Sequence, residues 1–524
     1  ITNNLNVAFS VFHDQYINWF QNRRILPFDF INNPLMGYLY KRRIPGVFHK
    51  QSLFAQDELA SVYHFPDSRY NPVPIIKWLQ YKVLAPPVEL PLEGVLIGRN
   101  TYRGQTKDIR IMRDDRTRHQ YIIGKSGSGK SVLLSYMARQ DILNGEGLCL
   151  VDPHGDLVED TIQAVPKERA KDIIVFDPAD IERPMGLNLL EAKTPEERDR
   201  ASLDAMEIFI KIFGDEIFGP RIQHYFRNAC LTLMEDEEEG ATLIDVPRMF
   251  TDEDFLKYKL GKVKNVVVRS FWEHEYANTG DREKQEMIPY FSSKFGPFIT
   301  NTTIRNIIGQ PKSAFDIGEI MNSQKVLLVN LSKGKIGDLN AQLLGLIFVN
   351  KISMAAMARQ EIPKEQRKDF YLYCDEFQNF ATDTFASILS EARKYRLALI
   401  MAHQYIAQLT KTPTGHDDTR VRDAVFGNVG TMLSFKVGAD DAEYLAKEYA
   451  PTLSEQDIIG IANYKAYIKL NIHNTTSRPF SMETIWDPIK NETLSEILHK
   501  YSRMKYGRKK LFVDQEIEAR LGIT

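Results

Sequence analysis

The chain has 524 residues, more than one hydrophobic core usually serves, so roughly two to four domains are expected. Its composition, 43% hydrophobic and 26% charged, is typical of a folded globular protein. The formal net charge of −2 excludes a general coat of positive charge for nucleic acid, so any DNA contact has to be local. The three cysteines lack paired spacing, which favours reduced thiols in the cytoplasm.

The N-terminal part is predicted to be a separate soluble region of about 95 residues, with a proline-rich linker at residues 85–91. The most apolar long window, 341–358, contains Asn350 and Lys351, so a buried helix is a better interpretation than a membrane span. Residue 1 is Ile rather than Met, and an upstream membrane anchor stays an open alternative. We expect a cytoplasmic protein, or one held at the cytoplasmic face of the membrane by such an anchor or by a partner.

Residues 124–131 read Gly-Lys-Ser-Gly-Ser-Gly-Lys-Ser, a complete G-x-x-x-x-G-K-S between an apolar run and a helix-like stretch. This order of strand, loop and helix is typical of a phosphate loop. Lys130 is predicted to reach the outer phosphates and Ser131 to offer a hydroxyl to Mg²⁺. The cofactors expected are therefore ATP and Mg²⁺. The predicted nucleotide-binding residues are Gly124, Lys125, Ser126, Gly127, Ser128, Gly129, Lys130 and Ser131.

Strand-like runs follow the loop at intervals, most of them separated by helical patterns. This arrangement predicts an α/β fold with a mostly parallel sheet covered on both faces. The run at 147–152 ends in Asp152, as buried parallel strands do where they deliver a side chain to a site. The other runs are 173–177, 326–330, 370–375, 397–402, 431–437 and 466–472.

The run at 370–375 ends in two adjacent carboxylates, Asp375 and Glu376, the pattern called Walker B. Asp375 is predicted to hold Mg²⁺, directly or through water, and Glu376 to polarise the water that attacks the γ-phosphate. A solvated strand end is the alternative, and the presence of a phosphate loop disfavours it.

Lys130 and Asp375 are farther apart in sequence than a nucleotide-binding core requires, so a segment is inserted between them. Residues from about 194 to about 315 have few strand-like runs and several amphipathic ones, which predicts a mainly helical domain. Its acidic run at 235–239 is expected to be a solvated loop, with partner binding as the lesser alternative.

Gln404 follows the apolar run at 397–402 and lies beside the nucleotide if that strand neighbours Asp375. A glutamine can contact both the γ-phosphate and the attacking water. Just upstream, Arg393 and Arg396 stand at the end of a predicted helix. An arginine there can stabilise a transferring phosphoryl group, in cis or from a neighbouring subunit, and a plain surface charge is the equal alternative.

Four segments together resemble a known family: 124–131, Val-Asp-Pro-His-Gly-Asp at 151–156, Asp-Glu-Phe-Gln-Asn-Phe at 375–380, and Ala-His-Gln at 402–404. They are similar to segments of conjugative coupling proteins of the TraG/TraD type, in the FtsK–HerA branch of RecA-like motor ATPases. The resemblance covers roughly residues 98–487. It implies a RecA-like P-loop ATPase core with an inserted all-α domain.

The resemblance further implies a homo-hexameric ring that hydrolyses ATP at its subunit interfaces and moves DNA towards a secretion channel. Partners of the secretion-channel or relaxase type are implied as well. The family's trans-acting arginine corresponds to Arg393, and Arg305 is a weaker candidate for an interface contact. The predicted catalytic residues are thus Glu376, Gln404 and Arg393. Coupling proteins usually begin with transmembrane helices, and this sequence departs from that pattern.

The C-terminal part carries basic residues and tyrosines without an acid at 500–510, a pattern suited to gripping phosphates and stacking on bases. A solvated, partly disordered tail fits equally well. Lys436 is a further candidate to face a channel. The predicted parts are an N-terminal region (1–95), two halves of the ATPase core (96–193 and 316–490), the helical insertion (194–315) and a basic C-terminal tail (491–524).

Two functions stay open beside the DNA translocase: a HerA-like DNA-processing motor working with a nuclease, and a nucleotide-regulated scaffold that docks secretion substrates. The pair of Asp375 and Glu376, together with Gln404, disfavours the scaffold, because a pure binding module does not need to position a hydrolytic water.

Overall fold

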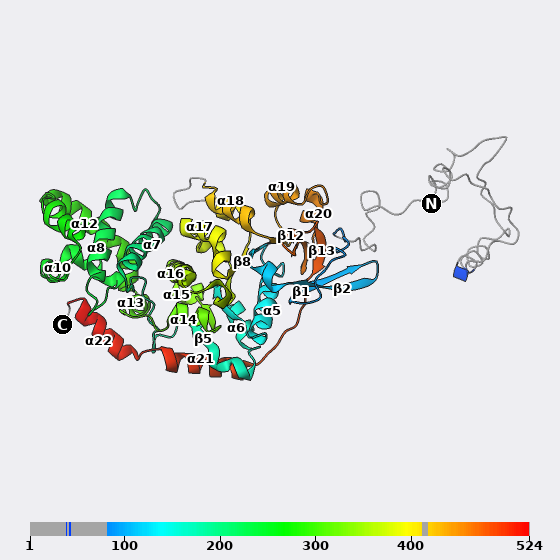
Figure 1. Cartoon of the computed structure of the whole chain (residues 1–524), viewed down its shortest axis with the longest axis horizontal. Helices are drawn as coiled ribbons and strands as arrows, with labels where there is room; N and C mark the ends of the chain where they lie inside the picture. The colour runs from blue at the N-terminus through cyan, green and yellow to red at the C-terminus, as the bar shows by residue number, and fades with distance from the viewer. Residues whose placement is uncertain (1–37, 39–40, 43–80, 411–417, 523–524) are drawn as a thin grey trace, which may run out of the picture. The chain divides into compact units, whose positions relative to one another are not determined.

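A computed structural model describes residues 38, 41–42, 81–410 and 418–522 (Figure 1). The chain divides into two compact units, Ile1–Trp78 and Leu79–Thr524, and nearly all described residues belong to the second. This unit begins before the predicted boundary at residue 95, because the preceding segment packs on the sheet: the Leu84 N–H donates to Ser481 Oγ at 3.0 Å. The rest of the predicted N-terminal region lies mostly outside the described residues.

An 11-stranded sheet forms the centre of this unit, in the order β2-β1-β13-β10-β9-β3-β8-β7-β4-β6-β5. All pairs from β9 to β5 are parallel, and those from β9 to β2 are antiparallel. The predicted α/β class with a mostly parallel sheet is confirmed. The strands, including the separate pair β11 and β12, are β1 (Val95–Tyr102), β2 (Gln105–Ile111), β3 (Gln120–Ile123), β4 (Gly147–Asp152), β5 (Ile173–Phe176), β6 (Val326–Asn330), β7 (Phe370–Cys374), β8 (Leu397–His403), β9 (Thr431–Ser434), β10 (Lys465–Lys469), β11 (Asn471–Ile472), β12 (Thr475–Thr476) and β13 (Phe480–Glu483).

Helices cover both faces of the parallel part, so strands such as β3, β4 and β7 are buried along their whole length. Alternate strand residues pack into two separate clusters, one with α5 and α6 and the other with α16 and α17. The helices of this part are α4 (Arg113–Arg116), α5 (Lys130–Leu143), α6 (Asp156–Ile162), α14 (Ile317–Asn322), α15 (Lys333–Ile336), α16 (Asp338–Ala358), α17 (Asp383–Glu391), α18 (Arg420–Asn428), α19 (Ala439–Glu448) and α20 (Glu455–Ile459).

A buried ion pair ties α4, α5 and β7 together. Arg116 Nη1 lies 2.5 Å from Asp141 Oδ1, and the Tyr373 hydroxyl donates to Asp141 Oδ2 at 2.5 Å. The guanidinium also lies over the ring of Tyr371, 3.6 Å from its centroid. Because an unpaired charge in this place would be strongly unfavourable, the network fixes how α5 lies on the sheet.

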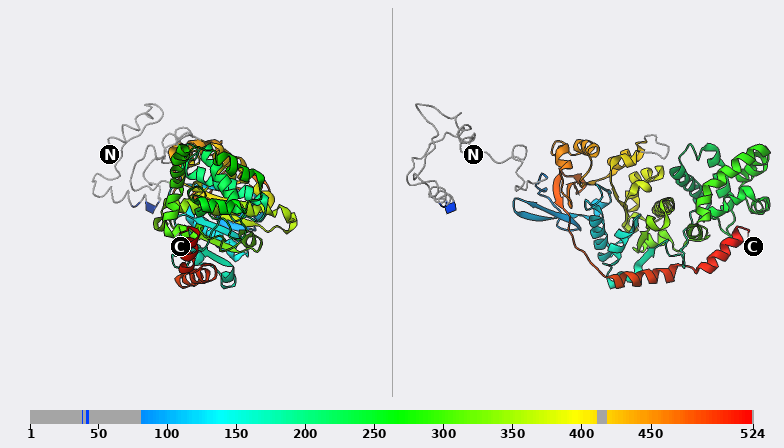
Figure 2. Two further views of the ribbon diagram at one scale, coloured as in Figure 1. Left: turned by 90° about the vertical axis from the view of Figure 1, so that its left-hand side faces the viewer. Right: turned by 180° about the vertical axis from the view of Figure 1, so that it is seen from behind.

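Helices are the only regular elements between β5 and β6, a stretch that the structure describes completely. They gather beside the sheet in Figure 1 and in the right-hand view of Figure 2, and they enclose an aromatic core in which Phe209, Phe226 and Phe295 are in contact. Thr194 begins the first helix with a capping box that Glu197 completes. Besides α14, these helices are α7 (Pro195–Phe213), α8 (Pro220–Met234), α9 (Arg248–Thr251), α10 (Glu253–Leu260), α11 (Val266–Ser270), α12 (Asp281–Thr300) and α13 (Thr302–Ile308).

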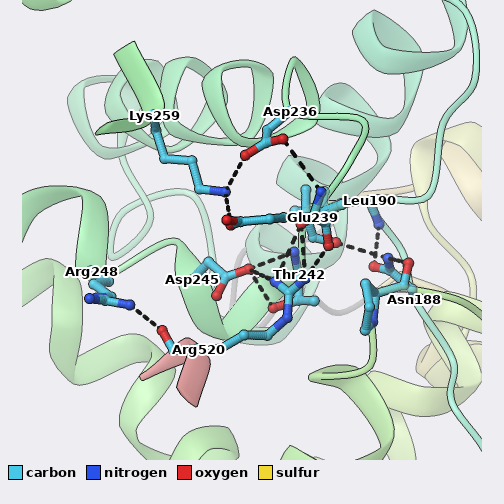
Figure 3. Close-up of polar contacts among 12 residues, drawn as sticks. Asn188, Leu190, Asp236, Glu239, Thr242, Asp245, Arg248, Lys259 and Arg520 are labelled. Carbon is cyan, nitrogen blue, oxygen red and sulfur yellow. Dashed lines mark hydrogen bonds and ion pairs between the residues drawn. The ribbon is translucent and has the colours of Figure 1, made fainter. Parts of the chain in front are cut away.

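The acidic run at 235–239 forms a turn in which Glu237, Glu238 and Glu239 are exposed, as predicted, whereas Asp236 is buried (Figure 3). Lys259 Nζ lies 2.8 Å from Asp236 Oδ2 and 2.6 Å from Glu239 Oε2, and both Lys259 and Asp236 are almost fully buried. The prediction was wrong for Asp236 because its countercharge comes from α10, which composition alone does not place nearby.

The C-terminal segment forms two docked helices, α21 (Glu492–Tyr506) and α22 (Lys510–Arg520), so the disordered alternative was wrong. Helix α21 lies along the edge strand β5 (Figure 1). There the Val175 N–H donates to Ser502 Oγ at 3.0 Å, so one backbone N–H of the edge strand has a hydrogen-bond partner. Helix α22 reaches the inserted helices: Arg520 Nη1 donates to Asp245 at 2.8 Å, and the Arg248 guanidinium donates to the Arg520 carbonyl (Figure 3).

Within the described residues, one helical stretch, Asp338–Glu361, is long and apolar enough to cross a membrane. Of its most apolar window, 67% is buried inside the protein, and α16 packs against α7, α14 and α17. Lys351, which interrupts the apolar pattern, donates to the Asn188 carbonyl at 2.7 Å. This is the buried helix predicted at 341–358.

Candidate nucleotide-binding site

The phosphate loop joins β3 to α5 at the carboxyl edge of the sheet. Gly127 and Gly129 have φ values of 73° and 116°, a region that side chains disfavour. A Cβ on Gly124 would come within 2.5 Å of Phe435 Cβ and 2.8 Å of Ser128 Oγ. These glycines therefore give the loop the left-handed turns and the close approach that a phosphate cradle needs.

Lys130 begins α5 beneath the loop and is only 6% exposed. Its Nζ donates to the carbonyls of Gly124 at 2.6 Å and Lys125 at 3.2 Å. Burial lowers the pKa of Lys130, an effect that the carboxylates of Asp375 and Glu376 oppose. Among the described residues, the hydrogen-bond partners of this buried ammonium are two carbonyls, an arrangement well suited to an anionic ligand.

Two further groups of the loop fit a nucleotide with its metal. The buried hydroxyl of Ser128 has no hydrogen-bond partner among the described residues. Ser131 is exposed in the first turn of α5. The Ser128 hydroxyl can donate a hydrogen bond to a phosphate oxygen, and the Ser131 hydroxyl can bind a divalent cation. These residues therefore fit the ligands that the motif predicts.

Asp375 and Glu376 follow β7 and are 5% and 7% exposed. Burial, the neighbouring Glu376 and Asp152 raise the pKa of Asp375 to about 7, while Lys130 lowers it. The Glu376 N–H donates to Asp375 Oδ1 at 3.0 Å, and Glu376 has a left-handed φ of 49°. Strain of this kind at the end of a buried strand is typical of functional sites.

Gln404 lies at the end of β8 and donates through Nε2 to Glu376 Oε1 at 2.7 Å. Gln378 donates to the other oxygen, Oε2, also at 2.7 Å. The structure thus brings Gln404 and Glu376 together, because β8 neighbours β7. Sequence reasoning missed Gln378, although it stands two residues after Glu376 in the quoted Asp-Glu-Phe-Gln-Asn segment. The two amides fix the plane of the carboxylate.

Asp152, at the end of β4, is buried and caps α6. Its carboxylate accepts from the backbone N–H groups of His154 and Leu157 at 2.8 Å and of Val158 at 3.2 Å. The acid that the strand pattern singled out therefore holds the 153–156 turn, and its charge contributes to the raised pKa of Asp375.

His403 is fully buried between β8 and β3, where its Nε2 lies 2.7 Å from the Tyr121 hydroxyl. Burial, with Lys130 as a further cause, lowers the pKa of His403 to about 3. The imidazole is therefore neutral near pH 7 and is poorly suited to general acid or base chemistry at the site.

Arg393 lies at the opposite edge of the sheet from these groups. It belongs to a 3-10 turn, η8 (Ala392–Tyr395), that precedes β8, whereas Gln404 follows β8. The seven residues of β8 span about 20 Å, so Arg393 cannot reach Glu376 of its own chain. The exposed guanidinium donates from Nη2 to Asn474 Oδ1 at 3.2 Å.

The other basic candidates are also placed. Arg305 is half-buried on α13 and donates to the Ile299 carbonyl at 3.2 Å. Lys436 is exposed beside the phosphate loop, where its carbonyl accepts from the Lys125 N–H at 2.8 Å.

In the C-terminal helices, several cations are neutralised within the chain. Arg503 lies 2.8 Å from Asp180, and Arg508 lies 2.7 Å from Glu516. Lys500, Lys505 and Lys509 remain exposed. The segment at 500–510 therefore offers fewer charges to phosphates than its composition predicts.

The sequence profile of the type IV secretory system conjugative DNA transfer family matches residues 92–459, more than half of the chain. The chain belongs to this family. No curated protein matches it.

Solved structures share the fold of this family member. The plasmid coupling protein TrwB with the non-hydrolysable ATP analogue ADPNP has a TM-score of 0.53 at 16% identity, covering 80% of this chain and 96% of TrwB. TrwB with ADP and Mg²⁺ has a TM-score of 0.52 at 15% identity, covering 78% and 98%. VirB4 of Thermoanaerobacter pseudethanolicus has a TM-score of 0.53 at 13% identity, covering 79% and 99%. At these identities the likeness shows the fold, and the RecA-like ATPase core is confirmed.

Proposed function

We propose that the chain is an ATP-driven DNA translocase of a conjugative transfer apparatus, hydrolysing ATP between the subunits of a ring. The carboxylate of Glu376, held at both oxygens by Gln404 and Gln378 beside Asp375, carries the proposal. Hydrolysis needs a fixed group that orients the attacking water, whereas a nucleotide-regulated scaffold does not. The family, which is named for conjugative DNA transfer, supports DNA as the substrate.

The phosphates of ATP would lie in the cradle of residues 124–131, with Lys130 turned from the loop carbonyls towards the outer phosphates. Ser131 and Asp375 would hold Mg²⁺, which neutralises charge on the β- and γ-phosphate oxygens when bound. The cation would also favour the ionised form of Asp375. TrwB, which shares the fold, binds an ATP analogue and, in a second structure, ADP with Mg²⁺.

The position of Arg393 supports hydrolysis at a subunit interface. A side chain about 20 Å from Glu376, at the far edge of the sheet, can act on a γ-phosphate only if that nucleotide belongs to another subunit. Its exposure is consistent with a group that awaits a neighbour. A closed homo-hexamer, as the family resemblance implies, would place one such arginine at every site.

The same proposal implies where the protein works and which partners it has. A DNA pump for conjugation would work at the cytoplasmic face of the membrane with secretion-channel and relaxase-type proteins. Exposed cations near the carboxyl edge, such as Lys436, are candidates for contact with DNA phosphates.

The test is ATP turnover with and without single-stranded and double-stranded DNA, on protein whose oligomeric state is measured in the same samples. We expect turnover by the assembled ring, a clear increase with DNA, and none with Lys130→Ala. Assembled rings whose turnover ignores both kinds of DNA would contradict translocation and favour the scaffold.

A further inference from the structure

The hairpin of β11 and β12 has a strained loop. Ile472 pairs with Thr475, so the loop consists of His473 and Asn474, with φ values of 49° and 64°. Two positive φ values define the type I′ family of hairpin turns, in which Asn-Gly is the favoured pair. A histidine in the left-handed region costs on the order of 1–2 kcal/mol. Some other interaction must therefore hold this loop.

Asp115 supplies that interaction. Its side chain, 2% exposed, accepts from the His473 N–H at 2.9 Å through Oδ2. Its Oδ1 accepts from the Asn474 N–H at 2.9 Å and from Asn471 Nδ2 at 3.0 Å. Charge-assisted hydrogen bonds of this kind are stronger than neutral ones. One buried carboxylate thus holds the loop through three hydrogen bonds, which is the kind of support that residues in a left-handed conformation need.

The loop presents one group to another element: Asn474 Oδ1 accepts from Arg393 Nη2 at 3.2 Å. Both side chains are exposed. An arginine in a short 3-10 turn otherwise loses about 2 kcal/mol of rotamer entropy when it becomes ordered at an interface. Asn474 Oδ1, as a fixed acceptor, orders part of the Arg393 side chain before assembly and so lowers this entropy cost. The other N–H donors of the guanidinium stay available for phosphate oxygens.

We infer that Asn474, anchored by Asp115, is a positioning residue that holds the Arg393 guanidinium ready for the nucleotide of the neighbouring subunit. The inference rests on the proposed function, in which Arg393 acts in trans. It adds a residue outside every nucleotide-binding motif in the sequence.

Asn474→Gly is the informative substitution because glycine is the preferred residue at this place in a type I′ turn. The variant removes the acceptor without straining the backbone, so thermal stability should be unchanged or slightly higher. We expect kcat to fall on the order of tenfold, as for loss of a hydrogen bond to a charged group, with KM for ATP unchanged. Asn474→Asp keeps an acceptor and tolerates the positive φ, so it should retain kcat. Normal or raised kcat in Asn474→Gly would overturn the inference.

Mixed rings assign the effect to the arginine. In a mixture of Arg393→Ala with Glu376→Gln, an active site combines Glu376 of the first chain with Arg393 of the second, and turnover should partly return. Adding Asn474→Gly to the Glu376→Gln chain should lower the restored turnover by the same factor as in the single variant. Adding it to the Arg393→Ala chain should leave the restored turnover unchanged.

The mixtures also separate two kinds of failure. If the first mixture, shown to contain mixed rings, stays inactive, Arg393 does not act in trans, and the role of Asn474 is overturned with it. If that mixture recovers while Asn474→Gly has no effect on the chain that supplies the arginine, only the role of Asn474 is overturned.

Discussion

The two ends of strand β8 carry the two parts of the proposed active site, and they are built in opposite ways. Gln404, after the strand, meets Glu376 among buried groups whose polar atoms are mostly bonded within the chain. Arg393, before the strand, is exposed, and within the part of the chain that the structure describes its guanidinium bonds to the side chain of Asn474. In the proposed function, the first end is complete in the single chain and the second acts on a neighbouring subunit.

Desolvation explains the difference. A carboxylate buried as deeply as Glu376 needs its hydrogen bonds within its own chain, because unpaired buried polar groups are costly. An arginine that contacts a phosphate only after the subunits assemble is hydrated by water until then. It loses that hydration only when the phosphate replaces it. The contrast is consistent with chemistry that is switched on by ring formation.

The largest effect on activity is expected from removing Lys130, the cation at the buried end of the proposed active site. Lys130→Ala removes the ammonium that would bind the outer phosphates, so ATP binding should weaken severely and turnover should stop. Binding of a fluorescent ATP analogue and steady-state turnover measure the two effects. The unliganded protein should melt near the wild-type temperature, since burial of Lys130 already disfavours its charge. Turnover at the wild-type rate would remove the loop from the active site.

At the exposed end, Arg393→Ala should lower kcat on the order of 10³-fold while ATP affinity stays near that of the wild type. Lys394→Ala is the matched control, because Lys394 is an exposed cation in the same turn, paired loosely with Glu391 at 3.9 Å. Its kcat should be close to wild type. Equal losses in the two variants would indicate a general effect of surface charge and would contradict an arginine finger.

Glu376→Gln sharpens the comparison at the buried end. The amide keeps the shape and burial of the side chain but cannot act as a base, so kcat should fall roughly 10²- to 10⁴-fold with ATP still bound. Nucleotide recovered from the protein by chromatography should be ATP rather than ADP. Gln378→Ala, which loses only one of the two donors, should have a smaller effect. Recovery of ADP from Glu376→Gln would remove Glu376 from its role.

The residues at the buried end of the proposed active site could be predicted from the sequence, because they stand in local motifs at the ends of apolar strands. The position of Gln404 near Asp375 also followed, since neighbouring parallel strands bring their carboxyl ends together. The partner of Arg393 did not follow, because Asn474 is 81 residues away and its approach depends on a hairpin fixed by Asp115. No sequence motif indicates that this hairpin places Asn474 beside Arg393.

The same limit applies to the fold. The apolar runs predicted the parallel strands well, but β2 is mostly exposed and polar, and β13 has only four residues, so neither produced an apolar run. Asp236, in the acidic run at 235–239, was misjudged for a related reason, since Lys259 neutralises it from another helix. Charges and edge strands depend on neighbours that composition does not reveal.

The smallest effect concerns His119, which supports the exposed end. Its Nδ1 accepts from the Leu399 N–H at 3.1 Å and its Nε2 lies 3.0 Å from the Leu389 carbonyl, so it joins β8 to the end of α17. Burial lowers the pKa of His119 to about 4, with the charge of Arg393 as a smaller cause and the bond to the Leu389 carbonyl opposing the shift.

Because the unfolded chain takes up a proton near pH 6.5 and the folded chain only near pH 4, stability from this group is present above pH 6.5 and is lost as the pH falls towards 4. The loss between pH 7 and pH 5 should be about 2 kcal/mol. His119→Asn suits the positive φ of 59° and removes the titration. Urea unfolding at both pH values should show the wild type losing more stability than the variant. Equal losses would show that the imidazole is not held neutral, and the support it gives to the arginine end would have to come from its neighbours.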